Sequence, residues 1–266
     1  MKPDDHRDAQ HRSAPSSKVV HEALMIEAHE ELARPSAALF WSGLAAGLSL
    51  GFSLVVEGIL HASLPESDWR PLVAKLGYGA GFLIVILGRQ QLFTENTLTP
   101  MLPVLRERKA APVRAMLRLW IIVLGSNLIG AAAFGIVIAQ SHMFAPDVQV
   151  AFRDIGLKAL EPGFGMIVLR GIFAGWLVAL LIWMLPFAES SRVFIILLLA
   201  WIIGVGELSH VIAGSVDVFA LAAAGHESWG RALASFTLPS LIGNIIGGCL
   251  LVAALNHKQV VAGEPR

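Results

Sequence analysis

Eight ionisable side chains fall inside stretches that are otherwise apolar, and their chemistry needs an explanation. They are Glu57, Lys75, Arg89, Glu95, Arg170, Glu207, His210 and Asp217. Charged groups in apolar membrane segments are costly, and they mark substrate pathways, ion pathways or proton relays. Arg170 does not lose its charge readily, so it needs a wet cavity or a carboxylate partner such as Glu207 or Glu95. A structural ion pair and a substrate-facing role both fit Arg170.

His210 has the most specific surroundings of these residues. It follows Glu207 and Ser209 at a polar break between two apolar runs. The imidazole is the side chain whose charge changes most readily near neutral pH. This setting favours a proton-transfer or hydrogen-bonding role over a purely structural histidine.

Enzyme chemistry is not indicated by the sequence. It has no His-Glu-x-x-His pattern, no phosphate-binding glycine loop and no nucleophile elbow. The single Cys249 excludes an intramolecular disulfide and a cysteine-built metal site. We therefore expect no enzyme activity, no cofactor and no metal. Lys and Arg balance Asp and Glu at 20 each, so no nucleic-acid partner is expected.

The composition places these residues in a membrane protein. Of 266 residues, 55 % are hydrophobic and 15 % are charged, and the mean hydropathy is +0.66. Soluble chains average roughly 45–50 % and 25 %. A crossing helix needs about 20 apolar residues, and six such elements are expected, at residues 37–61, 71–105, 115–140, 164–185, 192–225 and 232–256.

Two of these elements, 71–105 and 192–225, are too long for one straight crossing. Their 35 and 34 residues would make about 50 Å of helix, whereas the hydrocarbon layer is about 30 Å thick. Both carry polar residues in the middle, at 89–97 and 207–217. We therefore expect two broken helices, whose free backbone groups must be satisfied by protein or by a water-filled cavity.

The distribution of basic residues predicts the orientation. Of the 20 Lys and Arg residues, 13 fall on one side of this topology and 4 on the other, so both termini are expected in the cytoplasm. The chain then divides into a cytoplasmic tail with a short amphipathic helix (residues 1–34), a transmembrane channel or transporter domain (35–256) and a cytoplasmic tail (257–266).

The N-terminal tail has two parts. Residues 1–17 are polar, carry no secretory signal pattern and are expected to be disordered. Residues 17–34 have one mildly apolar face, which predicts a short helix against the bundle or a neighbouring subunit. A regulatory gate is the alternative.

Two sequence patterns predict how the spans pack. Gly43, Gly47 and Gly51 stand four residues apart, a spacing that lets two helix backbones touch. The Asn-Leu-Ile-Gly of residues 127–130 returns as Asn-Ile-Ile-Gly at 244–247, 117 positions later. If the motif marks two halves of three crossings each, the second half enters the membrane from the opposite side. The recurrence therefore favours an inverted 3+3 repeat with its pathway at the repeat interface. Two unrelated Asn-Gly packing motifs are the alternative.

The same shift carries Phe93, in the first break, onto His210, in the second. The neighbouring Thr94 would then lie opposite His210, where its hydroxyl could fix the imidazole tautomer. Leu92 and Phe93 would form a dry constriction beside it.

Several of these segments resemble the formate/nitrite transporter family. The resemblance rests on residues 92–94 (Leu-Phe-Thr), 209–213 (Ser-His-Val-Ile-Ala), 243–248 (Gly-Asn-Ile-Ile-Gly-Gly) and 125–130 (Gly-Ser-Asn-Leu-Ile-Gly), and it extends over about residues 37–256. Members of that family are homopentamers of the bacterial inner membrane. Each subunit has an aquaporin-like fold and its own pore for small monovalent anions of weak acids.

The resemblance also implies roles for individual residues. His210 would be the central histidine and Thr94 its partner, Leu92 and Phe93 would contribute to the hydrophobic constrictions, and Lys158 would be the basic residue of the extracytoplasmic vestibule.

The sequence differs from the family pattern at several positions. Ser209 and Gly214 stand where Glu and Asn are common, and Gly175 replaces an Asn of the fourth span. Glu95 and Arg170 are additional charges. The resemblance thus implies the fold and leaves the solute open, so the chain would be a divergent member.

Three functions remain in view. The first is a channel or transporter for a small monovalent weak-acid anion, attracted by Lys158 and protonated near His210. The second is a pore of the same fold for a cation, a neutral molecule or a larger anion, lined by Glu95, Glu207, Asp217, Arg89 and Arg170. The third is a sealed scaffold or sensor. The expected partners are the solute, further copies of the chain and membrane lipid.

Overall fold

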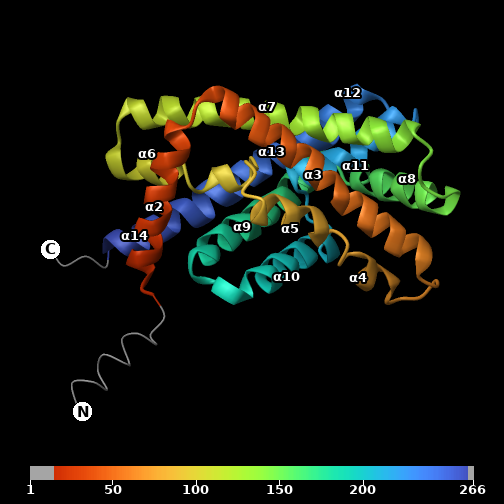
Figure 1. The fold of residues 1–266 in the computed structure, drawn as a ribbon, viewed down its shortest axis with the longest axis horizontal. Coiled ribbons are helices and arrows are strands. Elements are labelled where there is room, and N and C mark those ends of the chain that lie inside the picture. Colours follow the sequence, from red (N-terminus) through yellow and green to blue (C-terminus); the bar gives the residue numbers. More distant parts are fainter. Residues whose placement is uncertain (1–14, 263–266) are drawn as a thin grey trace, which may run out of the picture.

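The computed structural model describes residues 15–262, and over these residues the chain consists of helices and connecting segments without a strand. They form one elongated bundle (Figure 1). The elements are α2 (Ser17–Ala33), α3 (Ser36–Ser63), α4 (Arg70–Ala74), α5 (Gly79–Leu87), η1 (Glu95–Thr97), α6 (Met101–Glu107), α7 (Ala110–Gln140), α8 (Pro146–Leu160), α9 (Phe164–Met184), η2 (Leu185–Phe187), η3 (Glu189–Ser191), α10 (Arg192–Val205), α11 (Val211–Ala223), α12 (Trp229–Arg231), η4 (Ala232–Thr237), α13 (Leu238–Ile245), η5 (Ile246–Ala254) and α14 (Leu255–Ala262).

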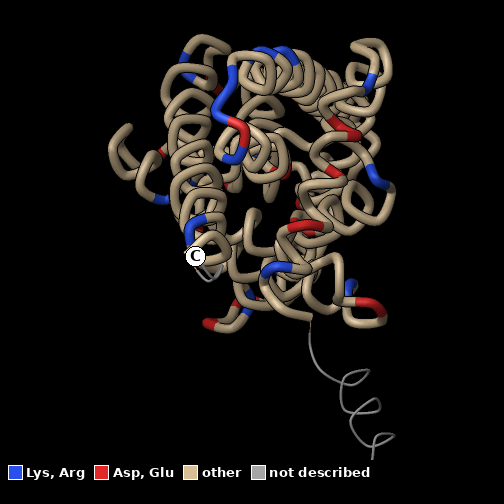
Figure 2. The backbone as a smooth tube through the Cα atoms, turned by 90° about the vertical axis from the view of Figure 1, so that its left-hand side faces the viewer, with Lys and Arg blue, Asp and Glu red and all other residues tan. Residues whose placement is uncertain are grey.

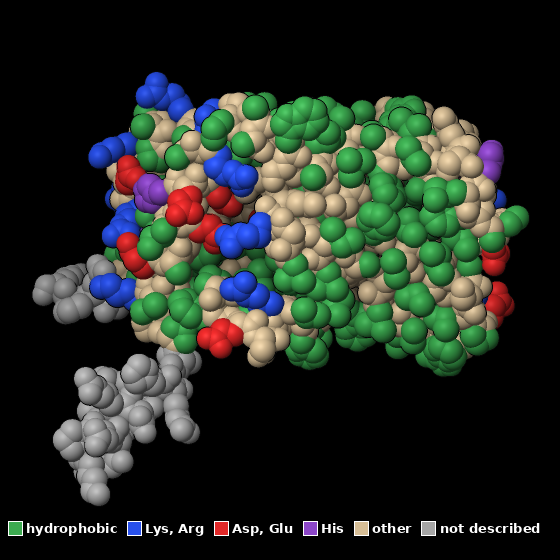
Figure 3. All heavy atoms as spheres, in the orientation of Figure 1, with side chains coloured by type: hydrophobic (Ala, Val, Ile, Leu, Met, Phe, Trp, Pro, Cys, Tyr) green, Lys and Arg blue, Asp and Glu red, His purple; other side chains and the backbone are tan. Residues whose placement is uncertain are grey.

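Five helical stretches of the described chain are long and apolar enough to cross a membrane: Ser36–Ser63, Arg70–Leu87, Ala110–Gln140, Phe164–Phe187 and Trp229–Ala262. On the visible face, charged side chains gather toward the two ends, and the broad middle is covered by apolar side chains and backbone (Figure 3). The prediction of an all-helical, multi-pass membrane protein is confirmed. The expected element at 192–225 contains no single helix of that length, because it is divided between α10 and α11.

Helices α5 and α10 end in the same way. Each is followed by a glycine and then by a residue with a left-handed backbone, Arg89 (φ 50°) and Glu207 (φ 51°). The N–H of the next residue donates to a carbonyl five positions back, at 3.0 Å and 2.9 Å respectively, which is a bond that closes many helix C-termini. Glycine is usual at the left-handed position, because a Cβ there costs roughly 1–2 kcal/mol. Residues 88–94 and 206–210 therefore leave the helical path at equivalent points.

The close pair α3–α7 depends on glycine. A Cβ at Gly43, Gly47 or Gly51 of α3 would meet α7, and a Cβ at Gly130 of α7 would lie 2.6 Å from the carbonyl oxygen of Leu44. The pair α9–α13 is packed in the same manner. The two close pairs bring polar side chains of α7 and α13 within reach of the backbone of their neighbours.

The bundle has two different ends. Helices α2 and α14 lie at one, here named the α2 end, and α4, α8 and α12 lie at the other, the α8 end (Figure 1). Seen from the α2 end, the helices surround a common centre, and several carry acidic and basic residues (Figure 2). Helix α2 packs on the bundle through Leu24 and Met25, which join Leu98 and Leu102 in a buried cluster. Of the disordered tail expected at residues 1–17, residues 1–14 lie outside the described residues, and Ser17 is the first residue of α2.

Helix α8 is absent from the six elements expected from the sequence. It starts at Pro146 with Asp147 in its first turn, and it buries Val148 and Phe152 against the bundle. Both features are ordinary helix signals. They escape a search for apolar runs of crossing length because the helix is short and half polar. Its last turn carries Lys158.

Replacing Gly130 by Ala is expected to destabilise the protein by about 1–3 kcal/mol, the usual cost of overpacking a close-packed interior. The added methyl would meet the backbone of α3. Gly125→Ala, in the same helix, is the matched control, because a Cβ there has no atom within 4 Å. Thermal unfolding in detergent checks this. Equal melting temperatures of the two variants would contradict the packing argument.

Candidate functional site

The first interruption is held by the side-chain amide of Asn127. Its Oδ1 accepts the backbone N–H of Phe93 (2.9 Å), and its Nδ2 donates to the carbonyls of Gln91 (2.9 Å) and Gly43 (2.7 Å). Asn127 is completely buried. One side chain thereby satisfies backbone groups that the end of helix α5 leaves unpaired in an apolar interior, where an unpaired group is costly.

Asn244 holds the second interruption with the same three bonds. Its Oδ1 accepts the N–H of Val211 (2.8 Å), and its Nδ2 donates to the carbonyls of Ser209 (2.8 Å) and Gly171 (2.8 Å). It too is completely buried. The duplicated Asn-x-Ile-Gly motif therefore corresponds to a duplicated hydrogen-bonding function.

These bonds correct the register expected between the two breaks. Asn127 and Asn244 are 117 positions apart, but the N–H groups that they accept, on Phe93 and Val211, are 118 apart. The equivalent of His210 is thus Leu92, one residue earlier than the uniform shift predicted. Under the same register Glu207 is equivalent to Arg89, in agreement with their common left-handed backbone.

His210 is fixed by two hydrogen bonds. It caps the N-terminus of α11, and its Nδ1 accepts the backbone N–H of Ala213 (3.1 Å). Its Nε2 lies 2.8 Å from Oγ1 of Thr94. Because a backbone N–H can only donate, Nδ1 is the acceptor, and the neutral imidazole carries its proton on Nε2 and donates to Thr94. The Phe82 ring meets the imidazole at 5.0 Å, edge to face.

Leu92 and Phe93 are brought next to this pair. Both are buried in the central apolar cluster, at 0 % and 1 % exposure, and Phe93 packs edge to face on Trp120 at 5.7 Å. Thr94 and His210 are equally buried, at 0 % and 1 %. A buried apolar layer therefore lies against the His–Thr hydrogen bond.

Cavities approach this layer from both ends of the bundle. The cavity at the α8 end has a volume of about 180 Å³ and reaches Ser209 and His210. The cavity at the α2 end has a volume of about 730 Å³ and reaches Gln91 and Glu95. In the sequence, these two residues directly flank residues 92–94. The buried His–Thr pair thus lies between two cavities that are lined by opposite ends of the bundle.

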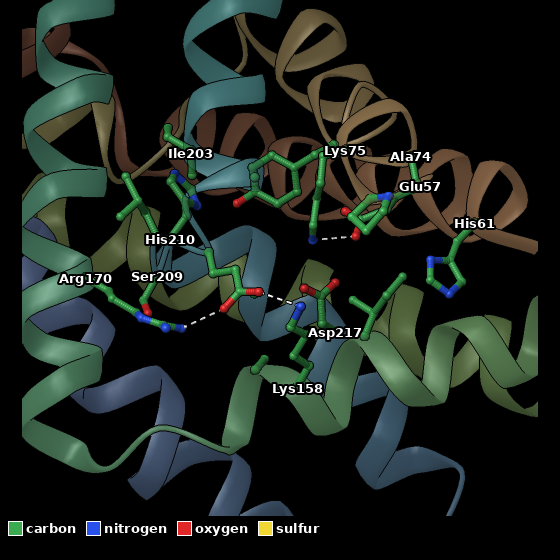
Figure 4. Close-up of a pocket in the computed structure, with 18 of the residues that line it drawn as sticks. Glu57, His61, Ala74, Lys75, Lys158, Arg170, Ile203, Ser209, His210 and Asp217 are labelled. Carbon is green, nitrogen blue, oxygen red and sulfur yellow. Dashed lines mark ion pairs between the residues drawn. The ribbon is translucent and has the colours of Figure 1, made fainter. Parts of the chain in front are cut away.

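The cavity at the α8 end contains two ion-paired groups (Figure 4). Oε1 of the Glu207 carboxylate lies 2.5 Å from Lys158 Nζ, and its Oε2 lies 3.3 Å from Arg170 Nη1. Of the two partners considered for Arg170, the structure brings it to Glu207. Lys75 Nζ pairs with Glu57 (2.5 Å).

The cavity at the α2 end holds the remaining predicted charges. Arg89 pairs with Glu27 of α2 (3.3 Å), while Glu95 lies deeper in the same cavity. These residues are at the opposite end from Arg170 and Glu207, so the eight ionisable side chains singled out from the sequence do not form one cluster. Among the described residues, no group of three or more His, Cys, Asp or Glu side chains is arranged to hold a metal ion.

Glu31 of α2 is a site residue that the sequence did not indicate. Its Oε2 accepts the Thr99 hydroxyl (2.7 Å) and its Oε1 accepts Gln91 Nε2 (3.2 Å), so it ties α2 to the first interruption. Burial raises the pKa of this carboxyl from 4.5 to about 7, and Glu27 adds to the effect, while the two hydrogen bonds oppose it. Nothing in a mildly amphipathic helix distinguishes Glu31 from its acidic neighbours before the docking partner is known.

Several apolar helices and a buried His–Thr pair between two cavities are the features of a membrane transport protein. Comparison with known proteins specifies the family. Residues 18–258 match the family described as formate/nitrite transporter, so the chain belongs to the formate/nitrite transporter family, whose members are channels and transporters and not enzymes. The predicted family membership is confirmed.

Similar proteins come from several organisms. The inner membrane protein YfdC of Escherichia coli (strain K12) is 36% identical over 241 residues, which cover 91% of this chain and 78% of that protein. The nitrite transporter NirC of Salmonella typhimurium (strain LT2) is 27% identical over 226 residues, covering 80% of each.

Solved structures show the same fold. An ion channel of the family aligns with a TM-score of 0.78 at 19% identity, covering 92% of this chain and 99% of the other. A pentameric formate channel with formate bound aligns with a TM-score of 0.70 at 17% identity, covering 83% and 95%.

Docking of α2 is expected to weaken as the pH rises from about 4.5 to about 7. A carboxyl whose pKa is raised in the docked state holds a proton that the released helix gives up, so the contribution of Glu31 to docking is lost as the pH rises through this window. Hydrogen exchange of α2 amides, corrected for the intrinsic pH dependence, checks this. Glu31→Gln should remove the dependence, whereas Glu30→Gln, at an exposed position of the same helix, should keep it. A pH-independent wild type would contradict the argument.

Asn244→Asp is expected to destabilise the protein strongly, because two buried carbonyls lose their donor and face a carboxylate. The cost is about 1–3 kcal/mol for each group left unpaired. Asn256→Asp, at a partly buried position of α14, is the control. The melting temperature of the detergent-solubilised protein is the measurement, and equal losses in both variants would show that the amide bonds do not hold the interruption.

Proposed function

We propose that this chain forms a channel or transporter for a small monovalent weak-acid anion, which passes the dry layer as a neutral acid after protonation near His210. The observation that carries the proposal is the buried His210–Thr94 hydrogen bond between two opposed cavities. Moving an uncompensated charge into an apolar environment costs many kcal/mol, whereas a neutral acid pays only for its polar groups.

The roles of the surrounding residues are consequences of this proposal. Lys158, at the α8 end, attracts the anion from outside the membrane. His210, with its Nε2 proton directed at Thr94, mediates protonation directly or through water. Leu92 and Phe93 keep the layer dry, so that a charged form does not cross it.

We also propose that the bundle is an aquaporin-like inverted 3+3 repeat. Its second crossing comprises α4, α5, η1 and α6, and its fifth comprises α10 and α11. The equivalent bonds of Asn127 and Asn244 support this assignment.

Residues 35–256 form the transmembrane domain, with both termini in the cytoplasm of a bacterium and the chain in the inner membrane, as the name of the YfdC relative suggests. A homopentamer is proposed by analogy with the pentameric formate channel.

A second candidate is a pore of the same fold for a cation or a neutral solute. The acidic lining of the α8-end cavity favours it, because Glu57, Glu207 and Asp217 all face that space. Reversal potentials in planar bilayers separate the two candidates. A cation-selective conductance supports the second, and electrically silent acid uptake supports the first. Absence of any solute flux would favour the third possibility, a sealed scaffold.

His210→Phe is expected to reduce formate uptake into proteoliposomes about tenfold or more, equivalent to at least 1.4 kcal/mol, and to abolish the increase in uptake at lower external pH. Thr94→Val should have a similar effect, because it removes the hydrogen-bond partner of Nε2. Thr94→Ser, which retains the hydroxyl, and His226→Phe, at an exposed position, are the controls. Equal and pH-insensitive fluxes in wild type and His210→Phe would exclude the proton role.

A further inference from the structure

Two cations from different helices meet on one carboxylate at the α8 end. Lys158 of α8 and Arg170 of α9 each contact a different oxygen of Glu207, at 2.5 Å and 3.3 Å. Their side chains are 56 % and 30 % exposed, and that of Glu207 is 35 % exposed. The arrangement is therefore a two-point clamp on a carboxylate, at the edge of water and not sealed in the core.

The third cation of the cavity is already engaged. Lys75 pairs with Glu57 at 2.5 Å. In the close-up, the dashed lines that end on Arg170 and Lys158 are separate from the one that joins Lys75 to Glu57 (Figure 4), and both belong to pairs with Glu207. Within the described part of the chain, the ion pairs of Lys158 and Arg170 thus converge on a single, partly solvated carboxylate.

Glu207 itself stands on a backbone that suits it poorly. Its φ of 51° lies in the left-handed region that glycine prefers. Backbone of this kind persists where the surroundings compensate for it. Here the two cations hold the side chain over the cavity that reaches His210.

We propose that Lys158 and Arg170 form a binding site for a small planar anion with two oxygens on one atom, and that Glu207 occupies this site as an internal substitute that the solute displaces. The shared chemistry covers carboxylates and nitrite. The inference rests on the proposed function for the passage of such an anion, but the binding site itself requires no transport.

The charge of the cavity supports displacement over simple attraction. Its lining holds four carboxylates and three Lys or Arg cations, namely Glu57, Asp154, Glu207, Asp217, Lys75, Lys158 and Arg170. With Glu207 in place, an entering anion meets no excess of positive charge. Once Glu207 moves aside, a bent two-oxygen anion can take over both contacts, and arginine in particular favours such planar partners.

An internal competitor lowers the apparent affinity by the fraction of molecules in which the site is free. Removing its charge should therefore tighten binding. Glu207→Gln in the full-length protein in lipid nanodiscs is expected to bind sodium formate roughly tenfold more tightly, a gain of about 1.4 kcal/mol. Titration of the saturation-transfer NMR signal of the formate proton measures the dissociation constant.

Further variants separate the clamp from a general change of charge. Glu207→Gly, which also suits the left-handed backbone, should fold and gain affinity in the same way. Adding Arg170→Gln to Glu207→Gln should cancel the gain. Nitrite should compete with formate more strongly in Glu207→Gln than in wild type, whereas chloride, a single atom without oxygens, should gain much less. Glu227→Gln breaks an exposed pair with Arg231 elsewhere and should leave formate binding unchanged.

Two results would overturn the inference. One is formate affinity that is unchanged or weaker in both Glu207→Gln and Glu207→Gly while the proteins remain folded. The other is an equal gain for chloride, which would reveal unspecific attraction. These outcomes can be told apart from a failure of the proposed function. Tighter binding in the Glu207 variants without uptake in any variant supports the clamp and contradicts transport. His210-dependent uptake with unchanged binding in the Glu207 variants supports transport and contradicts the clamp.

Discussion

The rest of the structure depends on how two buried asparagine amides satisfy backbone groups inside the bundle. An interrupted helix at membrane depth leaves N–H and carbonyl groups that water does not reach, and these groups must be paired within the protein. Asn127 and Asn244 each provide one acceptor and two donors for this purpose. The contact is possible because glycines allow α3 to approach α7 and α9 to approach α13. Close helix packing and helix interruption are thus parts of one arrangement.

A duplicated frame with different side chains creates the polarity of the site. The backbone path is equivalent at Arg89 and Glu207, and again at Leu92 and His210. One half therefore supplies a basic residue at the α2 end and an apolar residue at the centre. The other supplies an acidic residue at the α8 end and the imidazole. The two equivalent backbone paths give the frame of the site, and the different side chains on them give its chemistry.

The long-range apolar pattern and the family motifs were enough to predict the helical membrane architecture and the family, and both are confirmed. A uniform 117-residue shift failed by one residue at His210, because the two halves differ in length between break and asparagine. Helix α8 was missed because it is amphipathic and short.

Which side chains pair with each other was harder to predict from the sequence than where the helices lie along the chain. The sequence left Glu207 and Glu95 open as partners of Arg170, since both lie at breaks; their separation at opposite ends becomes visible only when the chain is folded. The docking contacts of Glu31 depend on Thr99 and Gln91, far along the chain. No local pattern encodes such a contact.

The division between partly exposed ends and a buried centre determines which polar contacts can be exchanged. Ion pairs that remain partly in water contribute little, typically about 0–1 kcal/mol, because water competes for both charges. The pairs of Arg89 with Glu27 and of Lys158 with Glu207 are of this kind, so a solute can replace a partner at small cost. The His210–Thr94 bond is completely buried, and breaking it without replacement leaves two unpaired groups in an apolar layer. Under the proposed function, a solute that replaces it brings hydrogen-bonding groups without a net charge, which is the property of a protonated small acid.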